Sequence, residues 1–299
     1  MKRFNSGISE YTVATLRSQT RLSVLLLLMS GSLCLAPSML VAQGRGGPGG
    51  RGGRGGPPPT AKASAPIDLT GYWTPVITED WSVRMLDEPA NAHRGRIPYT
   101  PAGVQLAAKW DPAKDEAEGN QCKSYGAPGI MRQPTHLHIT WQDDNTLKLE
   151  ADFGTQTRLF HFVPPAFAGR LDYVSGQYAP AETPKVAAPA GTESSWQGYS
   201  AAYWSVEGGN QVTEKSGDLT AVTTHLKPGY YWRNGMPYSG DAVLTEHFRV
   251  MELPDTSKWI ILVQIVEDPE YLNQRFVVNY QFKKLPDASK WNPTPCSVK

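Results

Sequence analysis

The chain has 299 residues, of which 29 are lysine or arginine and 28 are aspartate or glutamate, so its formal net charge at pH 7 is +1. A charge this close to zero argues against nucleic acid as a partner, because nucleic-acid binding depends on a basic surface. Hydrophobic residues make up 40% of the chain, which is enough to bury the core of a globular domain.

The first 42 residues have the features of a secretory signal peptide. Four basic residues precede an apolar stretch that begins at Leu22, and Ala42 occupies the expected cleavage position. Cleavage would remove those four basic residues and one acidic residue, leaving 25 basic and 27 acidic residues. We therefore expect a periplasmic or extracellular protein with no membrane span after cleavage. A retained N-terminal anchor is the alternative interpretation.

Residues 43–67 form a stretch rich in glycine, arginine and proline that cannot bury a core, and we interpret it as a flexible linker. The remainder, residues 68–299, has the composition and length of a single β-barrel domain. Its opening strand is expected at residues 71–78. Two short helices should follow, because Thr100 and Asp111 are N-cap residues that each precede a proline, and the second helix should end near Gly119.

Residues 133–163 predict a three-stranded meander. Alternation places Leu137, Ile139 and Trp141 on one face of the first strand and His136 and His138 on the other. A loop at Asp143–Asn145, with Asn145 left-handed, would pair Trp141 with Leu147, Ile139 with Leu149, Leu137 with Ala151, His138 with Glu150 and His136 with Asp152. A two-residue turn at Gly154–Thr155 would pair Leu149 with Phe160 and Leu147 with Phe162, and would set His161 opposite Lys148.

The polar face of this meander is a candidate metal site. His136, His138, His161 and Glu150 would lie close together there, and histidines two residues apart on a strand are ligands for zinc, copper or non-haem iron in β-proteins. A solvent-facing polar surface is the alternative, because antiparallel sheets commonly expose one face to water. No cofactor other than this metal is predicted.

Five more strands are expected, at residues 197–206, 218–226, 242–251, 259–267 and 275–283, after a Pro-rich loop at 164–195. Together with the opening strand and the meander they make about nine strands and no long helix. The fold class is therefore all-β, an antiparallel barrel with two short helices after the first strand.

Residues 227–241 gather aromatic side chains around an Asn-Gly turn. Tyr230, Tyr231, Trp232 and Tyr238 belong to this segment. Aromatic loops on a rigid scaffold can cover a ligand site, so these residues, with Trp73 and Trp141, are candidate ligand-binding residues. A plug that closes the end of the barrel is an equally good interpretation.

Two charged residues alternate with apolar ones and should point into the barrel. Arg158 lies in register with Phe160 and Phe162, and Glu246 lies in register with Leu244 and Phe248. Buried charges require a partner or a ligand. In an enzyme, Glu246 would be a general base, Arg158 would stabilise an anion, and His225 could join them from the end of its strand. A structural ion pair and a polar strand end are the alternatives.

Cys122 and Cys296 remain after cleavage of the signal peptide, and in an oxidising compartment they predict one disulfide. A bridge between such distant residues would stabilise the fold by about 4–5 kcal/mol on the chain-entropy model. Two buried thiols are the alternative.

The tripeptide Gly71-Tyr72-Trp73, at the head of an exported β-rich domain, resembles the GxW motif that opens lipocalins and related calycin barrels. The resemblance implies a barrel floor closed by Trp73 against a basic residue of the last strand, for which Lys283 and Arg275 are the candidates. It covers three residues, and the chain departs from that family in its greater length and in the helices after the first strand. Segments such as TEDWSVRM and KPGYYWRNGMPYS, and the meander itself, also resemble a group of exported bacterial proteins of no known function.

The sequence thus favours an exported β-barrel that binds a small apolar or aromatic molecule in a lumen covered by the aromatic segment. A cofactor-independent isomerase, lyase or hydratase that uses Glu246 and Arg158, and a metal-binding protein that uses the histidine face, are the alternatives.

Overall fold

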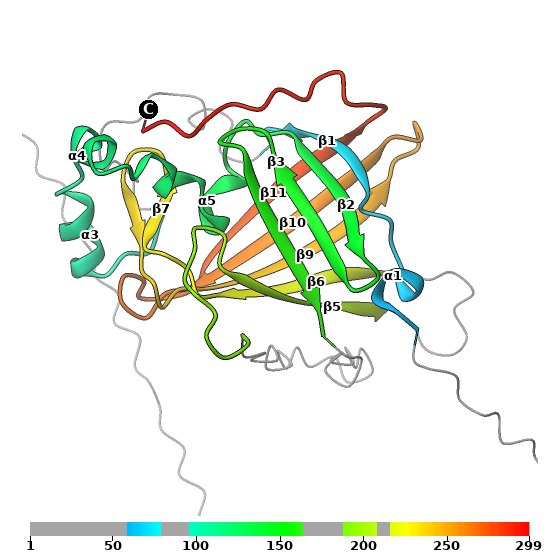
Figure 1. Cartoon of the computed structure of the whole chain (residues 1–299), viewed down its shortest axis with the longest axis horizontal. Coiled ribbons are helices and arrows are strands. Elements are labelled where there is room, and N and C mark those ends of the chain that lie inside the picture. Colours follow the sequence, from blue (N-terminus) through cyan, green and yellow to red (C-terminus); the bar gives the residue numbers. More distant parts are fainter. Residues whose placement is uncertain (1–58, 79–95, 164–187, 208–215, 299) are drawn as a thin grey trace, which may run out of the picture. The chain divides into compact units, whose positions relative to one another are not determined.

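The computed structural model describes residues 59–78, 96–163, 188–207 and 216–298, and within them nine strands close into a barrel (Figure 1). Around the barrel the order is β1-β11-β10-β9-β6-β5-β4-β3-β2, and β2 pairs with β1. The barrel strands are β1 (Gly71–Val76), β2 (Leu137–Asp143), β3 (Thr146–Ala151), β4 (Gln156–Phe162), β5 (Tyr199–Glu207), β6 (Ser216–Thr224), β9 (Val243–Glu252), β10 (Lys258–Glu267) and β11 (Phe276–Leu285). The predicted signal peptide, most of the predicted linker and residues 164–187 of the predicted loop lie outside the described residues.

The barrel is mixed, so the prediction of a purely antiparallel sheet is wrong. β4 and β5 run parallel, with Phe160 opposite Ser200 and Phe162 opposite Ala202, while the other neighbouring pairs of the barrel are antiparallel. Strand direction cannot alternate all the way around a ring that has an odd number of members, so nine strands require at least one parallel pair. The long connection between β4 and β5 makes that pair possible, because parallel neighbours need a crossover of a dozen or more residues.

The meander of β2, β3 and β4 has the predicted faces, but only its first hairpin has the predicted pairs. Leu137, Ile139 and Trp141 lie opposite Ala151, Leu149 and Leu147, which confirms the register of β2 and β3. Asn145 does not have the predicted left-handed backbone, and a register shift between Trp141 and Asp143 takes up the extra residue instead.

The register of the second hairpin differs by two residues from the prediction. Leu149 pairs with Arg158, Leu147 pairs with Phe160, and His161 lies opposite Thr146 instead of Lys148. The turn is longer than expected because Asp152 to Thr155 all lie outside the two strands. Gly154 and Thr155 both have positive φ, at 86° and 50°.

Both predicted helices are present, and their caps are the expected ones. They are α3 (Pro101–Ala107), where Thr100 Oγ1 accepts from the Gly103 amide, and α4 (Pro112–Ala117), where Asp111 Oδ1 accepts from the Ala113 amide. Three short helical segments were not predicted, namely α1 (Ala61–Ser64), the 3₁₀ helix η1 (Gln121–Tyr125) and α5 (Ala127–Ile130). Among the described residues, no helix combines the length and hydropathy needed to cross a bilayer.

The last residues of the predicted linker are bound to the barrel, so the ordered domain begins before Asp68. The Ala61 amide donates to Asn145 Oδ1 at 2.9 Å, and the Ala61 carbonyl accepts from the Trp204 indole at 2.8 Å. The Lys62 amide donates to the carbonyl of Asp144. Composition alone does not reveal these contacts, because they depend on the β2–β3 turn lying beside the segment.

Buried apolar side chains form two clusters. The first fills the barrel and includes Trp73, Leu149, Phe160, Phe248 and Phe282. The second lies at one end, between the barrel and a two-stranded sheet of β7 (Gly229–Trp232) and β8 (Met236–Tyr238). Figure 1 shows β7 grouped with α3, α4 and α5 at that end, with α1 at the other.

Candidate functional site

The two charged residues that the sequence directs inward meet inside the barrel. Arg158 on β4 is 2% exposed and Glu246 on β9 is fully buried. Their contact is bidentate, with Arg158 Nη1 donating to Glu246 Oε1 at 3.1 Å and Nη2 donating to Oε2 at 2.6 Å. The predicted inward placement is therefore confirmed, and the pair has the geometry of a strong charge-assisted interaction.

Neutral polar side chains surround this pair and form a layer between the two apolar clusters. Arg158 Nη2 also donates to Ser200 and Thr223, and Gln264 Nε2 donates to Glu246 Oε1 at 2.8 Å. Gln264 also reaches the Ala127 carbonyl of α5 at 3.4 Å, so the layer lies beneath the helical end of the barrel. Along β9, Glu246 stands between Leu244 of one cluster and Phe248 of the other.

The layer holds the carboxylate of Glu246 on both oxygens and isolates it from solvent. A general base needs an oxygen that can reach the proton it removes. In the described part of the chain, none of the hydrogen bonds of His225 leads to Arg158 or Glu246. His225 Nδ1 instead lies 3.0 Å from Thr224 Oγ1, and its backbone has a φ of 56°. The catalytic roles of these three residues remain predictions.

The aromatic segment is a plug for the end of the barrel. Tyr231, Trp232 and Tyr238 are buried and belong to the second apolar cluster, where they pack with residues such as Leu244 and Leu226. Tyr230 is the exception, because its side chain is half-buried and faces α4. Of the two interpretations of this segment, the structure supports the plug.

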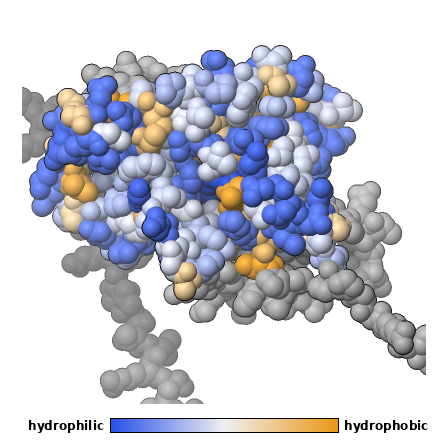
Figure 2. Space-filling model, viewed as in Figure 1, coloured by the Kyte–Doolittle hydropathy of each residue, from blue (hydrophilic) through white to orange (hydrophobic). Residues whose placement is uncertain are grey.

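A cleft of about 310 Å³ lies between the outer side of this plug and helices α3 and α4. Its apolar and aromatic walls come from Leu106, Trp110, Pro228, Tyr230, Pro237 and Tyr238. Its charged residues are Lys109, Asp111, Lys114, Asp115, Glu118 and Lys123, and Gly229 completes the lining. Figure 2 shows apolar residues beside strongly hydrophilic ones at the end of the molecule that carries α3 and α4.

A buried carboxylate organises the cleft. Asp115 of α4 is 5% exposed, its Oδ1 accepts from Lys123 Nζ at 2.5 Å, and its Oδ2 accepts from the Tyr230 hydroxyl at 2.7 Å. Burial raises the pKa of Tyr230, and the hydrogen bond to Asp115 raises it further, so the phenol remains protonated. Trp110 stands edge-to-face with Tyr230, with ring centroids 6.3 Å apart.

Two tyrosine hydroxyls of the plug, those of Tyr231 and Tyr238, are buried and have no hydrogen-bond partner among the described residues. Buried hydroxyls normally have a partner, so each needs an explanation. Tyr238 lines the cleft and Tyr231 does not. Burial raises the pKa of both, so both remain donors.

Trp73 belongs to the core, Trp141 is half-buried and packs against the core, and neither lines the cleft. Trp73 is fully buried, its indole donates to the Leu69 carbonyl at 2.9 Å, and Lys284 Nζ lies 5.3 Å from its ring centroid. A basic residue of the last strand does face this tryptophan, but it is Lys284 and not the predicted Lys283 or Arg275. Trp141 packs against Phe162, with ring centroids 5.5 Å apart.

The predicted histidine cluster is divided among three separate contacts. His136 Nδ1 lies 2.8 Å from Asp152 Oδ2, His138 Nδ1 lies 3.1 Å from Glu150 Oε2, and His161 stacks on Tyr199. His138 also stacks on Tyr72. Within the described residues, no group of three or more histidine, cysteine, aspartate or glutamate side chains is placed to hold a metal ion. The metal site therefore gains no support.

His161 and His247 are expected to make stability sensitive to acid. His247 on the outer side of β9 is mostly buried, with Nδ1 3.0 Å from Thr220 Oγ1, and burial lowers its pKa below 6.5 although Asp218 and Glu246 oppose the shift. Burial lowers the pKa of His161 in the same way. The unfolded chain therefore takes up these protons first as the pH falls. Their contribution to stability is complete above pH 6.5 and is lost as the pH falls below that value.

We expect the melting temperature to decline between pH 6.5 and about 5, and the substitution His247→Gln to reduce this decline. Glutamine can still bond to Thr220 but does not titrate. Thermal unfolding of both proteins across this pH range is the measurement, and an identical decline in the two would contradict the assignment to His247.

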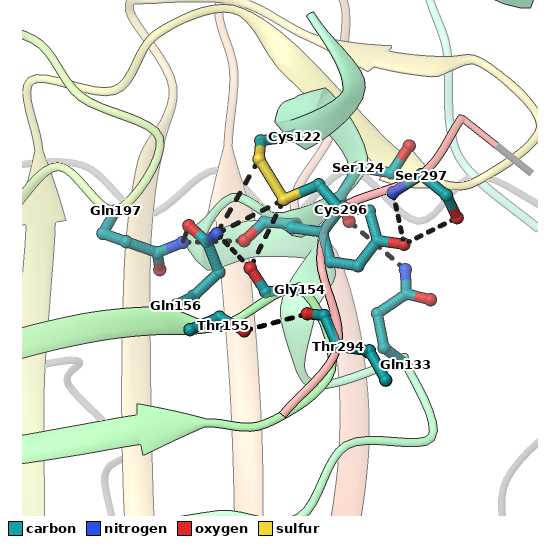
Figure 3. The surroundings of a disulfide bond; sticks show 11 residues. Cys122, Ser124, Gln133, Gly154, Thr155, Gln156, Gln197, Thr294, Cys296 and Ser297 are labelled. Atoms are coloured by element: carbon teal, nitrogen blue, oxygen red, sulfur yellow. Dashed lines mark hydrogen bonds between the residues drawn. A yellow bond between two sulfur atoms is a disulfide. The ribbon is translucent and has the colours of Figure 1, made fainter. Parts of the chain in front are cut away.

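The predicted disulfide is present. Cys122 of η1 and Cys296 of the C-terminal segment are bonded, with their Cα atoms 5.2 Å apart. Figure 3 shows Gln156 beside the bridge, donating to the Gly154 carbonyl at 2.7 Å, and Thr155 donating to the Thr294 carbonyl at 2.9 Å. The bridge thus fixes η1 to the C-terminal segment, which is hydrogen-bonded to the β3–β4 turn. Lys123 of the cleft directly follows Cys122 in η1.

Sequence reasoning found Tyr230 and Tyr238 of the cleft but missed Trp110, Asp115 and Lys123. One feature of the sequence could have indicated the cleft, namely an aromatic residue, Trp110, between two capped helices. Comparisons of the chain with protein-family models, with curated proteins and with solved structures gave no match. Its function must therefore be inferred from the contacts within the cleft.

Proposed function

We propose that this chain is an exported, calycin-like β-barrel protein that binds a small apolar or aromatic molecule. The binding site is the cleft between the aromatic plug and helices α3 and α4. The observation that carries the proposal is the cleft of about 310 Å³ itself, whose aromatic residues Trp110 and Tyr230 stand beside the buried carboxylate of Asp115. Ligand sites typically combine apolar walls with a few polar groups that fix the orientation of the ligand.

The lumen is a poorer location for the ligand than the cleft. Large buried side chains such as Trp73, Phe160 and Phe248 pack against one another inside the barrel. The plug adds Tyr231 and Trp232 above the polar layer. A ligand in the lumen would have to displace this packing, whereas the cleft is already open to solvent on one side.

Export is supported by two features that are far apart in the chain. The basic and apolar segment at residues 1–42 has the features of a signal peptide, and the disulfide between Cys122 and Cys296 is typical of oxidising compartments. The periplasm or the extracellular space is therefore the proposed location.

The test compares binding by the wild-type chain with binding by Trp110→Ala and Trp259→Ala. The probe is 2-acetonaphthone, whose flat rings suit the aromatic wall, and the dissociation constant is measured by equilibrium dialysis. We expect Trp110→Ala to weaken binding about tenfold or more, because it removes one aromatic wall. Trp259, which is half-buried on the outer side of β10, is the matched control and should leave binding unchanged. Absence of binding to the wild-type chain, or equal binding by all three proteins with intact melting curves, would refute the proposal.

A further inference from the structure

We infer that the Cys122–Cys296 disulfide is a redox switch for the cleft, and that its reduction by a dithiol weakens ligand binding. The inference rests on the proposed function and adds the regulation of the same site. Three observations support it. The bridge fixes η1 to the barrel, η1 holds the buried carboxylate of the cleft, and both cysteines are only half-buried.

The bridge anchors the start of η1. This 3₁₀ helix has five residues, and within the described part of the chain no side chain caps its N-terminus. Hydrogen bonds in 3₁₀ helices have poor geometry, so the position of such a short segment depends on contacts outside it. The Gln133 and Gln197 side chains donate to the carbonyls of its last two residues. Its second residue, Cys122, is held instead by the bond to Cys296 (Figure 3).

The other end of the bridge is tied to the barrel. Two residues before Cys296, the Thr294 amide donates to the Asp152 carbonyl at 2.9 Å. The Thr155 hydroxyl donates to the Thr294 carbonyl at 2.9 Å. Asp152 and Thr155 both lie in the turn between β3 and β4, so the disulfide fixes the start of η1 relative to the barrel wall.

η1 in turn holds one side of the cleft. Lys123, the residue after Cys122, donates to Asp115 Oδ1 at 2.5 Å, and Asp115 Oδ2 accepts from the Tyr230 hydroxyl at 2.7 Å. The backbone of η1 also packs closely on β7, because a Cβ atom at Gly229 would lie 2.5 Å from the Lys123 carbonyl oxygen. A displacement of Lys123 would therefore disturb Asp115 and, through it, the aromatic wall at Tyr230.

The position of helix α4 depends on the same contacts. Among its six residues, Asp115 is the one that is buried, so the helix is held to the molecule largely through this side chain. The Gln121 side chain of η1 donates to the Glu116 carbonyl of α4 at 3.2 Å, which joins the two helices a second time. Release of the start of η1 would therefore loosen α4 as well, and with it one wall of the cleft.

Reduction is a two-electron exchange between the bridge and an external dithiol. One thiolate of the dithiol attacks a cysteine sulfur, the Cys122–Cys296 bond breaks, and the other cysteine leaves as a thiolate that takes up a proton. The second thiol of the reductant then displaces the first cysteine, which is protonated in the same way. The products are two cysteine thiols and the cyclic disulfide of the reductant. Because both cysteines are half-buried, a small dithiol can reach them.

The experiment measures the binding of 2-acetonaphthone by equilibrium dialysis to the oxidised chain and to the chain reduced with dithiothreitol. The temperature is one at which circular dichroism shows every sample to be folded. Leu219→Ala is the control for lost stability, because Leu219 is fully buried in the barrel, does not line the cleft, and destabilises the fold when truncated. Lys123→Met tests the route, because it removes the contact between η1 and Asp115.

We expect reduction to weaken binding about tenfold or more, and Leu219→Ala to bind as tightly as the oxidised wild-type chain. Oxidised Lys123→Met should already bind weakly, and reduction should change its affinity by less than about twofold, because the same route is already broken. Equal affinities of the oxidised and reduced wild-type chains would overturn this inference and leave the proposed function intact. Equal weakening by Leu219→Ala, or the full loss on reduction of Lys123→Met, would also overturn it.

Amide hydrogen exchange tests the coupling without a ligand. The Asn120 amide donates to the Asp115 carbonyl at 2.7 Å, and the Lys123 amide donates to the Asn120 carbonyl at 3.1 Å. Both amides should exchange about tenfold faster or more in the reduced chain than in Leu219→Ala. If 2-acetonaphthone binds neither form, the proposed function fails. Faster exchange would then still support control of the cleft by the bridge, whereas unchanged exchange would overturn it.

Discussion

Replacing Arg158 with methionine is expected to lower the free energy of unfolding by about 3–5 kcal/mol, because it leaves the carboxylate of Glu246 buried without its partner. Glu246 is fully buried, and within the described part of the chain the remaining donor to its carboxylate is the side-chain amide of Gln264. An amide cannot compensate a full charge in so dry an environment. Denaturant titration of the purified variant at pH 7 measures the loss.

The double substitution Arg158→Met/Glu246→Leu is the control for this result. It removes both charges and fills the same space with apolar atoms, so it should recover most of the stability that the single substitution loses. Recovery should be incomplete, because Ser200, Thr223 and Gln264 lose partners in the polar layer. A single variant that loses less than about 1 kcal/mol would show that the pair is not buried as described.

Loss of the disulfide should have an effect of similar size. The substitutions Cys122→Ser and Cys296→Ser together are expected to lower the free energy of unfolding by about 4–5 kcal/mol. The bridge joins residues separated by 174 positions, so its removal frees a very long loop in the unfolded chain. Guanidinium unfolding of the double variant against the oxidised wild-type chain measures the difference.

The reduced wild-type chain is the control for the serine variant. It lacks the bridge but keeps both sulfur atoms, so its unfolding midpoint should match that of the variant. Equal midpoints for the oxidised chain and the serine variant would contradict the expected stabilisation. A serine variant with a lower unfolding midpoint than the reduced chain would instead indicate that packing of the sulfur atoms beside Gln156 also contributes to stability.

The first hairpin shows how far an alternating pattern determines structure. Leu137, Ile139 and Trp141 on one strand, with Leu147 and Leu149 on the next, fix both the buried face and the register of β2 and β3. The predicted conformation of the β2–β3 turn is wrong because two different backbone arrangements give the same register. The extra residue can sit in a three-residue loop, or it can be absorbed by the irregularity between Trp141 and Asp143 that the structure contains.

The second hairpin shows the limit of the same pattern. Side chains on a strand alternate with a period of two, so a shift of two residues keeps every side chain on its face. The prediction therefore placed Arg158 and Phe160 correctly inside the barrel while pairing them with the wrong residues of β3. The choice between the two registers depends on the conformation of the Asp152–Thr155 turn, which the apolar pattern does not encode.

The cleft was the least predictable part of the chain. Asp115 and Glu116 lie in α4 and Glu118 is its C-cap residue, but only Asp115 of the three is buried. Its burial depends on Tyr230 and Lys123, which reach it from the plug and from η1. Nothing local to α4 distinguishes the three acidic residues, so this part of the site requires the tertiary structure.

Two short strand pairings divide the wall of the closed barrel into two sheets. One sheet consists of β2, β3 and β4, and the other consists of β5, β6, β9, β10, β11 and β1. β4 and β5 share three residue pairs, as do β1 and β2, whereas β9 and β10 share ten. The two short contacts are the places where the wall would separate first during local unfolding. Arg158 extends from one sheet to the other, because it lies on β4 and binds Ser200 on β5, Thr223 on β6 and Glu246 on β9. The buried ion pair therefore acts as a cross-link over the parallel edge, and parting β4 from β5 would require two charges to separate in an apolar interior.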